Sequence, residues 1–375
     1  MSSTLAEHLS YLKLPRRHDA YSQAIKCVLS GGETVADLGC GVGVLGIQCL
    51  QHGAAHVWGI DHSDAIEIAR ETVDREGFSD QYTCLRDATF RAKLPDRVDL
   101  IICDHVGFFG IDYGIIDMLE DAKARMLKPG GTVMPRCIAL KIAAVSSEEC
   151  HQLAHSWTKE PIPQEFAWLD QYSVNSIHPV KLKLEDLCAT ETALGEVRLD
   201  QRVDDTLLLS AKIIATRDVT INGLAGWFNC ELAEGVWMTN SPIAAESIER
   251  PQAFFPFSNP IEAAKGDSFD VSFRIRHDKS IFAWTVTPCN GSPAQRMTNW
   301  KSLILTGKDL ETRLDVPLAL NAQGDARLKI LSLVDGKRTA REIEALVLEQ
   351  YPDLFASGAA ITRFLRSELG DGADC

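Results

Sequence analysis

The chain has 375 residues, of which 45% are hydrophobic, and its 52 acidic side chains outnumber 38 lysines and arginines. This length and this composition predict a folded protein of two or three domains. The net charge of −14 disfavours a nucleic-acid backbone or an anionic membrane as the main partner. No apolar run approaches the roughly 20 residues of a membrane span, and the N-terminus has neither the charged nor the apolar region of a signal peptide, so we expect a cytoplasmic protein.

The eleven cysteines are scattered and form no C-x-x-C pair. Several lie within apolar stretches, such as Cys103 after Ile101 and Ile102. This distribution is typical of buried, reduced thiols that pack as small hydrophobic side chains. We therefore expect neither a metal site nor a disulfide framework.

A glycine loop connects an expected strand to an expected helix near the start of the chain. The strand Thr34–Asp37 leads into the loop, and the apolar spacing of Val44–Leu50 predicts the helix. Glycines let the chain turn sharply and approach a ligand where a Cβ would obstruct it. A second strand, His56–Ile60, places Asp61 where an open α/β sheet holds a ribose. The loop residues expected to contact a nucleoside cofactor are Gly39, Cys40, Gly41 and Gly43.

The residues around the loop indicate which nucleoside it binds. The loop lacks the G-x-G-x-x-G spacing of dinucleotide sites, and Asp37 just before it would repel a pyrophosphate. No lysine of the G-K-[ST] type follows, which disfavours a nucleoside triphosphate. S-adenosylmethionine fits, because its sulfonium and ammonium groups are cationic.

Helices and strands alternate through the first part of the chain. The alternation predicts a doubly wound parallel sheet, a Rossmann-like α/β fold, over residues 1–143, with helices at the N-terminus. The segment Lys128–Gly131 is expected to end the last helix and to open the last strand. The other predicted elements are a helix over 64–76, strands over 82–86 and 98–103, a helix over 115–127 and a strand over 132–135.

The periodicity changes beyond residue 143. Runs that alternate at period two, such as 206–214, 223–232 and 268–276, predict an antiparallel, β-barrel-like domain over 144–317. Helical spacing then returns and predicts a small helical module over 318–375. Its helices are expected over 326–334, 339–350 and 357–369.

The order of these parts, and several segments within them, resemble the protein arginine methyltransferases over roughly residues 10 to 280. The resemblance implies a sheet domain that binds S-adenosylmethionine and a β-barrel that helps to cover the substrate. It also implies that Arg17 binds the carboxylate of the cofactor. Besides the glycine loop with Asp61, the similar segments are Arg17–Tyr21, Asp104–Phe108, Leu127–Pro135, Gly223–Leu232 and Arg250–Phe257.

The acceptor side departs from that family. The family holds a guanidinium between two glutamates of one hairpin; the first corresponds to Asp104, and the second corresponds to Tyr113 with Asp112 beside it. The Thr-His-Trp element of the family corresponds to Ile248–Arg250, and Arg250 would repel an arginine substrate. The resemblance therefore implies the scaffold and the cofactor and leaves the substrate open.

Four residues are candidates for the catalytic site. Asp104 follows a central strand, at the edge where α/β sheets bind ligands, and it can hold a cationic amine or guanidine, take its proton, or merely cap a turn. His105 is a candidate base near neutral pH, with a structural histidine as the alternative. Tyr113 and Asp112 can complete the pocket, although Gly110–Gly114 can equally be a plain turn.

Three further residues complete the expected cofactor site. Asp87, with Ala88 beside it, ends the strand over 82–86 and is expected to accept a hydrogen bond from the adenine amino group. His62 is expected to contact the ribose, with an exposed surface position as the alternative.

The C-terminal helices resemble small winged-helix modules that bind the leader peptides of ribosomally made, modified peptides. The resemblance rests on Ile330–Leu346, where a helix ends in Asp-Gly before Thr-x-x-Glu-Ile, and on Phe364 with Leu365. It implies that an extended peptide binds by strand addition. Seven basic residues face nine acidic ones over 321–375, which disfavours DNA; a structural or dimer-forming extension is the alternative.

These observations give three hypotheses for the function. The first is a methyltransferase that uses S-adenosylmethionine to methylate a nitrogen of a peptide, a protein or a small biosynthetic intermediate, with Asp104 orienting the nucleophile. The second is oxygen methylation of a small metabolite, for which His105 matters more. The third is a catalytically inactive regulatory protein that still binds the cofactor. The family resemblance also implies a homodimer, with Phe166–Tyr172 as the candidate arm.

Overall fold

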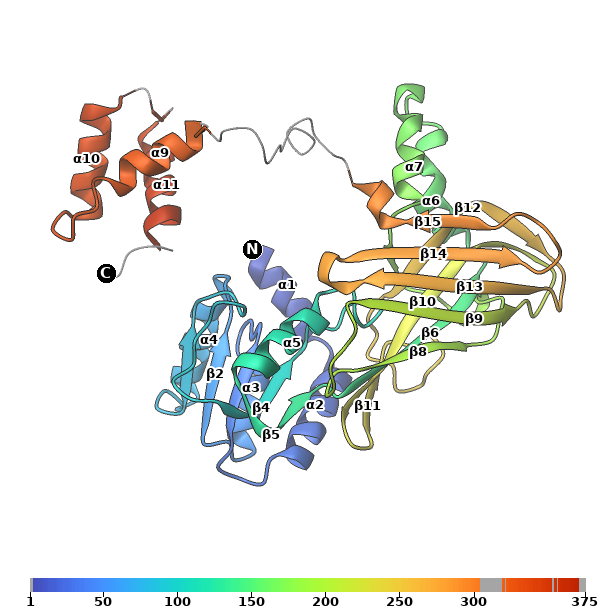
Figure 1. Cartoon of the computed structure of the whole chain (residues 1–375), viewed down its shortest axis with the longest axis horizontal. Coiled ribbons are helices and arrows are strands. Elements are labelled where there is room, and N and C mark those ends of the chain that lie inside the picture. Colours follow the sequence, from blue (N-terminus) through green and yellow to red (C-terminus); the bar gives the residue numbers. More distant parts are fainter. Residues whose placement is uncertain (1–2, 304–318, 321, 353, 356, 371–375) are drawn as a thin grey trace. The chain divides into compact units, whose positions relative to one another are not determined.

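The computed structural model describes residues 3–303, 319–320, 322–352, 354–355 and 357–370. The chain divides into two compact units, Met1–Leu303 and Ile304–Cys375 (Figure 1). Among the described residues, no helix has the length and the apolar character needed to cross a membrane.

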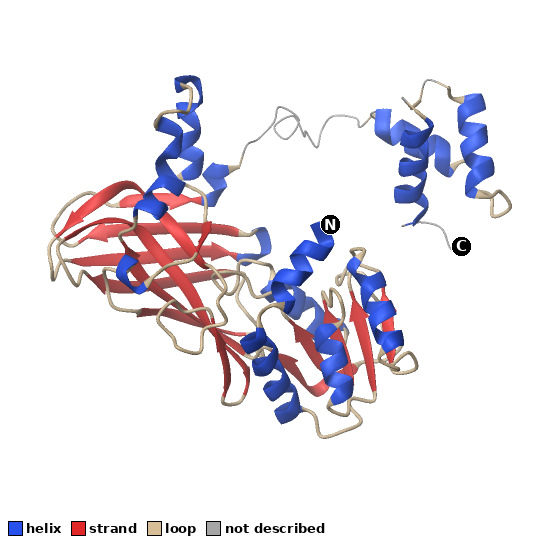
Figure 2. Ribbon diagram, turned by 180° about the vertical axis from the view of Figure 1, so that it is seen from behind, coloured by secondary structure: helices blue, strands red, loops and turns tan. Residues whose placement is uncertain are grey.

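A five-stranded parallel sheet forms the first part of the larger unit (Figures 1 and 2). Its order is β3-β2-β1-β4-β5, so the chain moves outward in opposite directions on the two sides of β1. Open α/β sheets bind ligands at this switch point, outside the carboxyl ends of the strands. The prediction of a Rossmann-like parallel sheet is confirmed. The strands are β1 (Thr34–Leu38), β2 (His56–Ile60), β3 (Tyr82–Leu85), β4 (Val98–Cys103) and β5 (Leu127–Met134), and the helices are α1 (Ser3–Leu12), α2 (Pro15–Val28), α3 (Val44–Gln51), α4 (Ala65–Arg75) and α5 (Ile115–Arg125).

The end of α5 and the start of β5 differ from the prediction. We expected the helix to reach residue 127 and the strand to begin at residue 132, whereas α5 ends at Arg125 and β5 begins at Leu127. The pairing of β5 with β4 shifts between Leu127 and Thr132. Gly130, with a φ of 79°, lies within this irregular stretch, so the Pro-Gly-Gly segment forms a bulge inside the strand and does not precede it.

Two antiparallel sheets form the second part of the larger unit. They pack through aromatic rings, with centroid distances of 5.0 Å between Phe255 and Phe273 and 5.4 Å between Phe255 and Trp284. The prediction of antiparallel β structure is confirmed, and closure into a barrel stays a prediction. One sheet holds β6 (Cys137–Val145), β7 (His178–Val180), β8 (Thr192–Arg198), β10 (Val219–Ala233), β11 (Val236–Thr239) and β12 (Gln252–Ala263); the other holds β9 (Thr206–Ile214), β13 (Ser268–Arg276), β14 (Ile281–Pro288) and β15 (Gln295–Thr298).

The change from the parallel to the antiparallel part falls before β6. We expected the first domain to extend to residue 143, whereas β6 pairs with β10 and β8 along its length from Cys137. The side chains of β6 are apolar and buried along nearly the whole strand, as they are in the parallel strands. Hydrophobicity alone therefore does not show where the parallel part ends and the antiparallel part begins.

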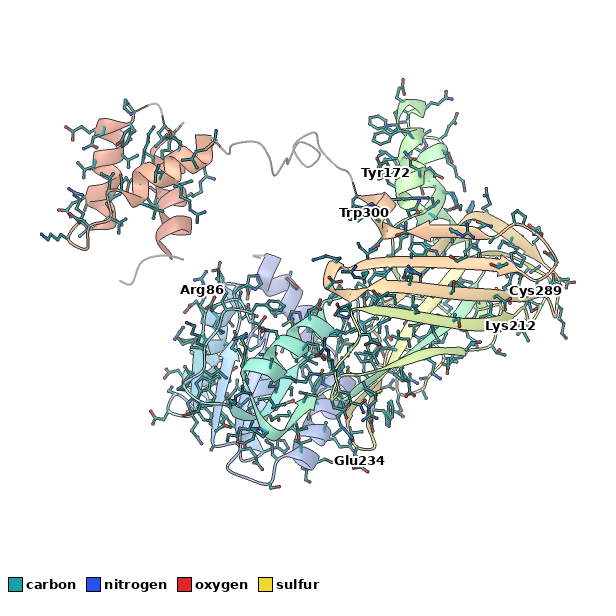
Figure 3. The ribbon with its side chains drawn as sticks, viewed as in Figure 1. Arg86, Tyr172, Lys212, Glu234, Cys289 and Trp300 are labelled. Atoms are coloured by element: carbon teal, nitrogen blue, oxygen red, sulfur yellow. The ribbon has the colours of Figure 1, made fainter. Side chains whose placement is uncertain are left out.

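Short helices project from the antiparallel part as an arm (Figures 1 and 2). Phe166 and Trp168 on this arm are about half exposed, and α7 contacts the 3-10 helix Asn299–Ser302, so Tyr172 lies near Trp300 (Figure 3). A dimer formed through the arm stays a prediction. The arm comprises α6 (Glu148–His155), α7 (Asp170–Ser173) and the 3-10 helices Ser156–Thr158 and Gln164–Leu169; other 3-10 helices are Leu184–Asp186 and His277–Lys279.

The smaller unit contains α9 (Ala322–Leu331), α10 (Ala340–Gln350) and α11 (Gly358–Gly370). Thr339 begins α10 with a capping box, in which its hydroxyl accepts a hydrogen bond from the Glu342 amide and its own amide donates to the Glu342 carboxylate. Its described residues include no strand, so the wing of a winged helix stays a prediction. The boundary expected at residues 317–318 lies outside the described residues.

Asn240 connects the two parts of the larger unit. Its side chain is fully buried; the Oδ1 atom accepts from the Phe228 amide at 3.0 Å, and the Nδ2 atom donates to the carbonyl oxygens of Phe108 and Pro251 at 2.8 Å. One amide thus fixes the segment after β4 against the strands of the antiparallel part.

We expect Asn240→Ala to lower the free energy of unfolding by about 2–4 kcal/mol, because it leaves one buried and two partly buried backbone groups without their partner. Urea unfolding measures this loss. Asn299 is the control, since it makes two similar bonds, to Phe282 and Ser280, at a less buried place. If Asn240→Ala and Asn299→Ala lowered the free energy of unfolding equally, the claim that the buried Asn240 amide contributes more would be wrong.

Candidate functional site

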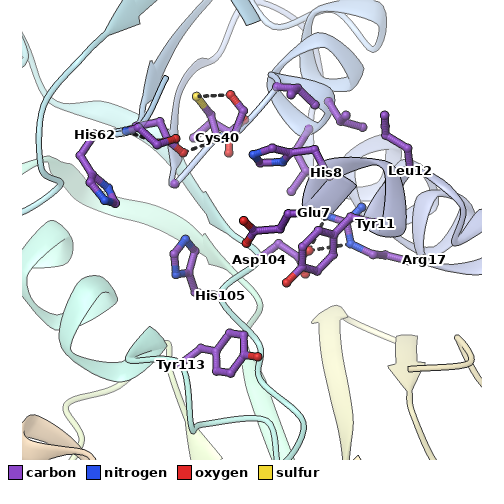
Figure 4. Close-up of a pocket in the computed structure, with 18 residues that line it drawn as sticks. Glu7, His8, Tyr11, Leu12, Arg17, Cys40, His62, Asp104, His105 and Tyr113 are labelled. Carbon is purple, nitrogen blue, oxygen red and sulfur yellow. Dashed lines mark hydrogen bonds and ion pairs between the residues drawn. The ribbon is translucent and has the colours of Figure 1, made fainter. Parts of the chain in front are cut away.

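A cavity of about 420 Å³ opens at the carboxyl ends of β1, β2 and β4. The glycine loop forms one wall, and α1 forms another (Figure 4). This volume suits one small ligand, and its position is the switch point of the sheet.

The glycine loop and Asp61 meet as the sequence predicts. The Asp61 Oδ2 atom accepts from the Gly41 amide at 2.9 Å, and its Oδ1 atom accepts from the amide and the hydroxyl of Ser63 at 2.8 Å and 2.7 Å. Gly41 has a φ of 54°, which favours glycine, and a Cβ there would lie 2.7 Å from His8 Cε1. Gly39 and Cys40 also line the cavity, while Gly43 lies behind it at the start of α3.

Asp37 is a buried carboxyl group in the wall of the cavity. It is 1% exposed, and its Oδ2 atom accepts from the Gly46 amide at 2.9 Å. Burial raises its pKa to about 7, and the Gly46 hydrogen bond opposes this shift. A cationic ligand beside Asp37 would favour the ionised form.

Arg17 and Asp104 form a buried ion pair that the sequence analysis did not anticipate. Arg17 Nε donates to Asp104 Oδ2 at 2.6 Å, Arg17 Nη2 contacts the same oxygen, and the Tyr21 hydroxyl donates to Oδ1 at 2.7 Å. Burial alone would lower the pKa of Arg17, but the charge and the hydrogen bond of Asp104, together with the nearby Tyr21 and Tyr11, raise it. We expected Arg17 to face the cofactor and Asp104 to face the acceptor; here each neutralises the other.

The other predicted catalytic residues lie in different surroundings. The His105 ring packs against Gly39 in the cavity, and burial lowers its pKa. Tyr113 lines the cavity, 43% exposed. Asp112 does not line it: its oxygens accept from the amides of Phe108 and Phe109 at 3.0 Å and 2.8 Å, so it stabilises its own turn.

Of the residues expected at the ribose and the adenine, one lines the cavity and two do not. His62 lines the cavity and is exposed. Asp87 and Ala88 do not line it; Asp87 accepts from the Ala88 amide at 2.7 Å and from Arg91 Nε at 3.0 Å. An adenine contact at Asp87 stays a prediction.

Known proteins similar to this chain are methyltransferases. Residues 22–170 match the family described as ribosomal protein L11 methyltransferase (PrmA). The chain is 25% identical to the probable protein arginine N-methyltransferase 1.2 of Arabidopsis thaliana over 313 residues, which is 83% of this chain and 70% of that protein. It is 27% identical to protein arginine N-methyltransferase 1 of Saccharomyces cerevisiae over 252 residues, 63% of this chain and 70% of that protein.

The chain is an S-adenosylmethionine-dependent methyltransferase. Its fold is also similar to a chain of the Trypanosoma brucei PRMT1 enzyme-prozyme heterotetrameric complex with AdoHcy, with a TM-score of 0.67 and 17% identity over 78% of this chain and 97% of that one. The prediction of a methyltransferase scaffold that uses S-adenosylmethionine as its cofactor is confirmed.

The cavity of the methyltransferase suits this cofactor. Gly39 and Gly41 lack the Cβ atoms that would crowd the cavity, and Asp61 is bonded to the loop at Gly41. The raised pKa of Asp37 gives a carboxyl group whose ionisation a sulfonium or an ammonium would favour. Among the described residues, no group of three or more acidic, histidine or cysteine side chains could hold a metal ion.

Sequence reasoning missed the contribution of α1 to the methyltransferase site. Glu7, His8, Tyr11 and Leu12 line the cavity, and they face Asp104 and His105 across it (Figure 4). Positions 8, 11 and 12 share one helix face, so helical spacing just before Arg17 was the available signal.

We expect Gly41→Val to abolish cofactor binding, because the new side chain would meet His8 and would strain a left-handed residue. Calorimetry with S-adenosylhomocysteine measures this effect. Gly77→Val is the matched control: Gly77 has a φ of 76°, and a Cβ there would meet nothing within 4 Å. If a folded Gly41→Val variant bound S-adenosylhomocysteine normally, the assignment of the glycine loop to the cofactor site would be wrong.

The affinity for S-adenosylmethionine should rise between about pH 6 and pH 8. Asp37 has a pKa of about 7, so it is protonated at the lower end of this range, and a cationic ligand prefers the ionised form present at the upper end. Binding should therefore release a proton. The isosteric Asp37→Asn variant should bind more weakly at pH 8 and lose the pH dependence. A flat profile for the unsubstituted protein, measured by calorimetry, would contradict this role.

Proposed function

We propose that the methyltransferase transfers the methyl group of S-adenosylmethionine to a nitrogen of a peptide, a protein or a small biosynthetic intermediate. The observation that carries this proposal is the meeting of the glycine loop, Asp104 and His105 in one cavity. The names of the similar arginine N-methyltransferases support nitrogen as the acceptor atom.

The proposed cofactor site uses residues from three strand ends and α2. When bound, S-adenosylmethionine would supply a methyl group whose carbon a nucleophile attacks in line, while the carbon–sulfur bond breaks and S-adenosylhomocysteine leaves. Asp61 accepts hydrogen bonds from the ribose, and Asp37 faces a cationic group. Arg17 has five N–H donors, more than Asp104 engages, so it can hold the cofactor carboxylate as well.

Asp104 and His105 divide the work on the acceptor in this proposal. Asp104 already faces Arg17 and the Tyr21 hydroxyl, which reduces its attraction for a cation. His105 has a lowered pKa and is largely neutral at pH 7, so it can take the proton that the nucleophile loses. We therefore assign the orientation of the acceptor to Asp104 and proton removal to His105.

The acceptor nitrogen should be neutral when it reacts. A guanidinium held between two free carboxylates of one hairpin requires a second acid on that hairpin, and Asp112 is bonded to the amides of its own turn. Arg250, 5% exposed, stacks at 5.4 Å from the Tyr11 ring in the cavity wall and adds a positive charge. Oxygen methylation of a small metabolite is the second candidate, because a neutral His105 suits a hydroxyl group equally well.

Three further features of the proposal come from the sequence. The helical unit beyond residue 318 binds a leader peptide by strand addition, the arm over Phe166–Tyr172 forms a homodimer, and the protein works in the cytoplasm. Deleting residues beyond about 320 should then weaken the affinity for a peptide acceptor more than the chemical step. Untouched peptide affinity together with dissociation of the oligomer would make this unit structural.

Transfer of labelled methyl groups tests the proposed acceptor. The full chain is incubated with tritiated S-adenosylmethionine and with peptides that carry arginine, lysine or histidine in one fixed sequence, and with small-molecule and protein fractions of a cell extract. Acid hydrolysis and chromatography then identify the methylated group. Label on nitrogen supports the proposal, and label released as methanol by mild base would favour a carboxylate oxygen. Cofactor binding with no labelled product in any fraction would contradict it.

We expect His105→Asn to lower kcat about a hundredfold or more, because a general base contributes factors of about 10² to 10⁴, with little change in cofactor affinity. Asp104→Asn should also lower turnover, with a smaller effect on cofactor affinity because it leaves Arg17 without its charged partner. His52→Asn is the control, since His52 does not line the cavity. Unchanged turnover in both Asp104→Asn and His105→Asn would move the acceptor site elsewhere.

A further inference from the structure

The ring of Tyr11 lies close to the guanidinium groups of two arginines. The centre of its ring is 6.0 Å from Arg17 Cζ and 5.4 Å from Arg250 Cζ. Tyr11 comes from α1, Arg17 from α2, and Arg250 from the segment before β12, so one ring joins three segments of the chain. Guanidinium groups within about 6 Å of a ring centre are attracted by the electrons of its face.

Both arginines are held in place by other contacts. Arg17 is paired with Asp104, and Arg250 Nη1 donates to the Val106 carbonyl at 2.6 Å while its guanidinium lies 5.7 Å from the Phe108 ring. Arg250 makes no ion pair with any carboxylate of the described part of the chain. The ring of Tyr11 therefore meets two fixed cations, one of which forms no ion pair within the described part of the chain.

The rest of α1 is weakly packed. Leu5, Leu9 and Leu12 are 46%, 40% and 46% exposed. A ten-residue helix is not stable alone in water and needs tertiary contacts. Tyr11 supplies such a contact, and the same helix carries Glu7 and His8 to the cavity.

We propose that Tyr11 is a positioning residue that holds α1 over the cofactor. Its ring couples the position of Arg250, which is held at the Val106 carbonyl, to the position of Arg17, which lines the cavity. Cofactor affinity then depends on Arg250, although Arg250 does not line the cavity. This role goes beyond the proposed acceptor chemistry, since it concerns the closure of α1.

Calorimetry with S-adenosylhomocysteine tests the role of the ring, because this product binds without turnover. Tyr11→Leu removes the ring and keeps an apolar, helix-forming side chain, and it should weaken binding about tenfold. Tyr11→Phe keeps the ring face and should restore most of the loss. Leu9→Ala, an exposed position on the same helix that does not line the cavity, should bind as the unsubstituted protein does.

Arg250→Met tests the coupling. We expect it to weaken binding roughly three- to fivefold, and Arg250→Lys to restore part of the loss. The double variant Tyr11→Leu/Arg250→Met should bind no more weakly than Tyr11→Leu alone, since both changes remove one shared contact. Trypsin provides a second measurement: with saturating S-adenosylhomocysteine, cleavage after Lys13 should be faster in Tyr11→Leu than in Leu9→Ala.

Three results would overturn the proposal. These are an affinity in Tyr11→Leu within twofold of the unsubstituted protein, a Tyr11→Phe variant as weak as Tyr11→Leu, and losses that add in the double variant. A loss in Tyr11→Leu that Tyr11→Phe restores, together with a non-additive double variant, would support it.

Discussion

The buried ion pair between Arg17 and Asp104 is the contact on which the site depends. It joins α2 to the end of β4, and the Tyr21 hydroxyl completes it. Breaking a buried pair by removing one partner costs about 3–5 kcal/mol, because the remaining charge is left in a medium of low polarity. Neither partner can therefore turn to a ligand unless that ligand supplies a replacement charge. The cofactor carboxylate and the acceptor are in this way linked through two side chains that already bind each other.

The same burial acts in opposite directions on the other titratable groups of the cavity. It raises the pKa of Asp37 to about 7 and lowers the pKa of His105, so near pH 7 about half of Asp37 is protonated and His105 is largely neutral in the free protein. The cationic cofactor changes this balance, since it favours the ionised form of Asp37 and leaves His105 free to accept a proton.

Local patterns predicted the fold well, and long-range contacts escaped prediction. The strands β1, β2 and β4 and the glycine loop follow from apolar runs and glycines that are adjacent in sequence. The pairing of Arg17 with Asp104 joins residues 87 positions apart, and nothing in either segment specifies the partner. The bulge in β5 was missed because Pro and Gly commonly end a helix, and here they interrupt a strand. The contribution of α1 was missed because its side chains at the cavity depend on where α2 places the helix.

The turn after β4 explains why a small rotation of Asp112 cannot bring a second carboxylate to the acceptor side of the cavity. Asp112 is partly buried, and it accepts hydrogen bonds from the amides of Phe108 and Phe109. Rotating it toward the cavity would leave both amides without a partner, at about 1–3 kcal/mol each. Burial also raises the pKa of Asp112, so ionisation gives no gain that would offset this cost. On this turn a cationic acceptor would meet one compensated carboxylate, with the positive charge of Arg250 held nearby at the Val106 carbonyl, so a second carboxylate would have to come from Glu7 on α1. This is the physical reason to look for an acceptor that carries no charge.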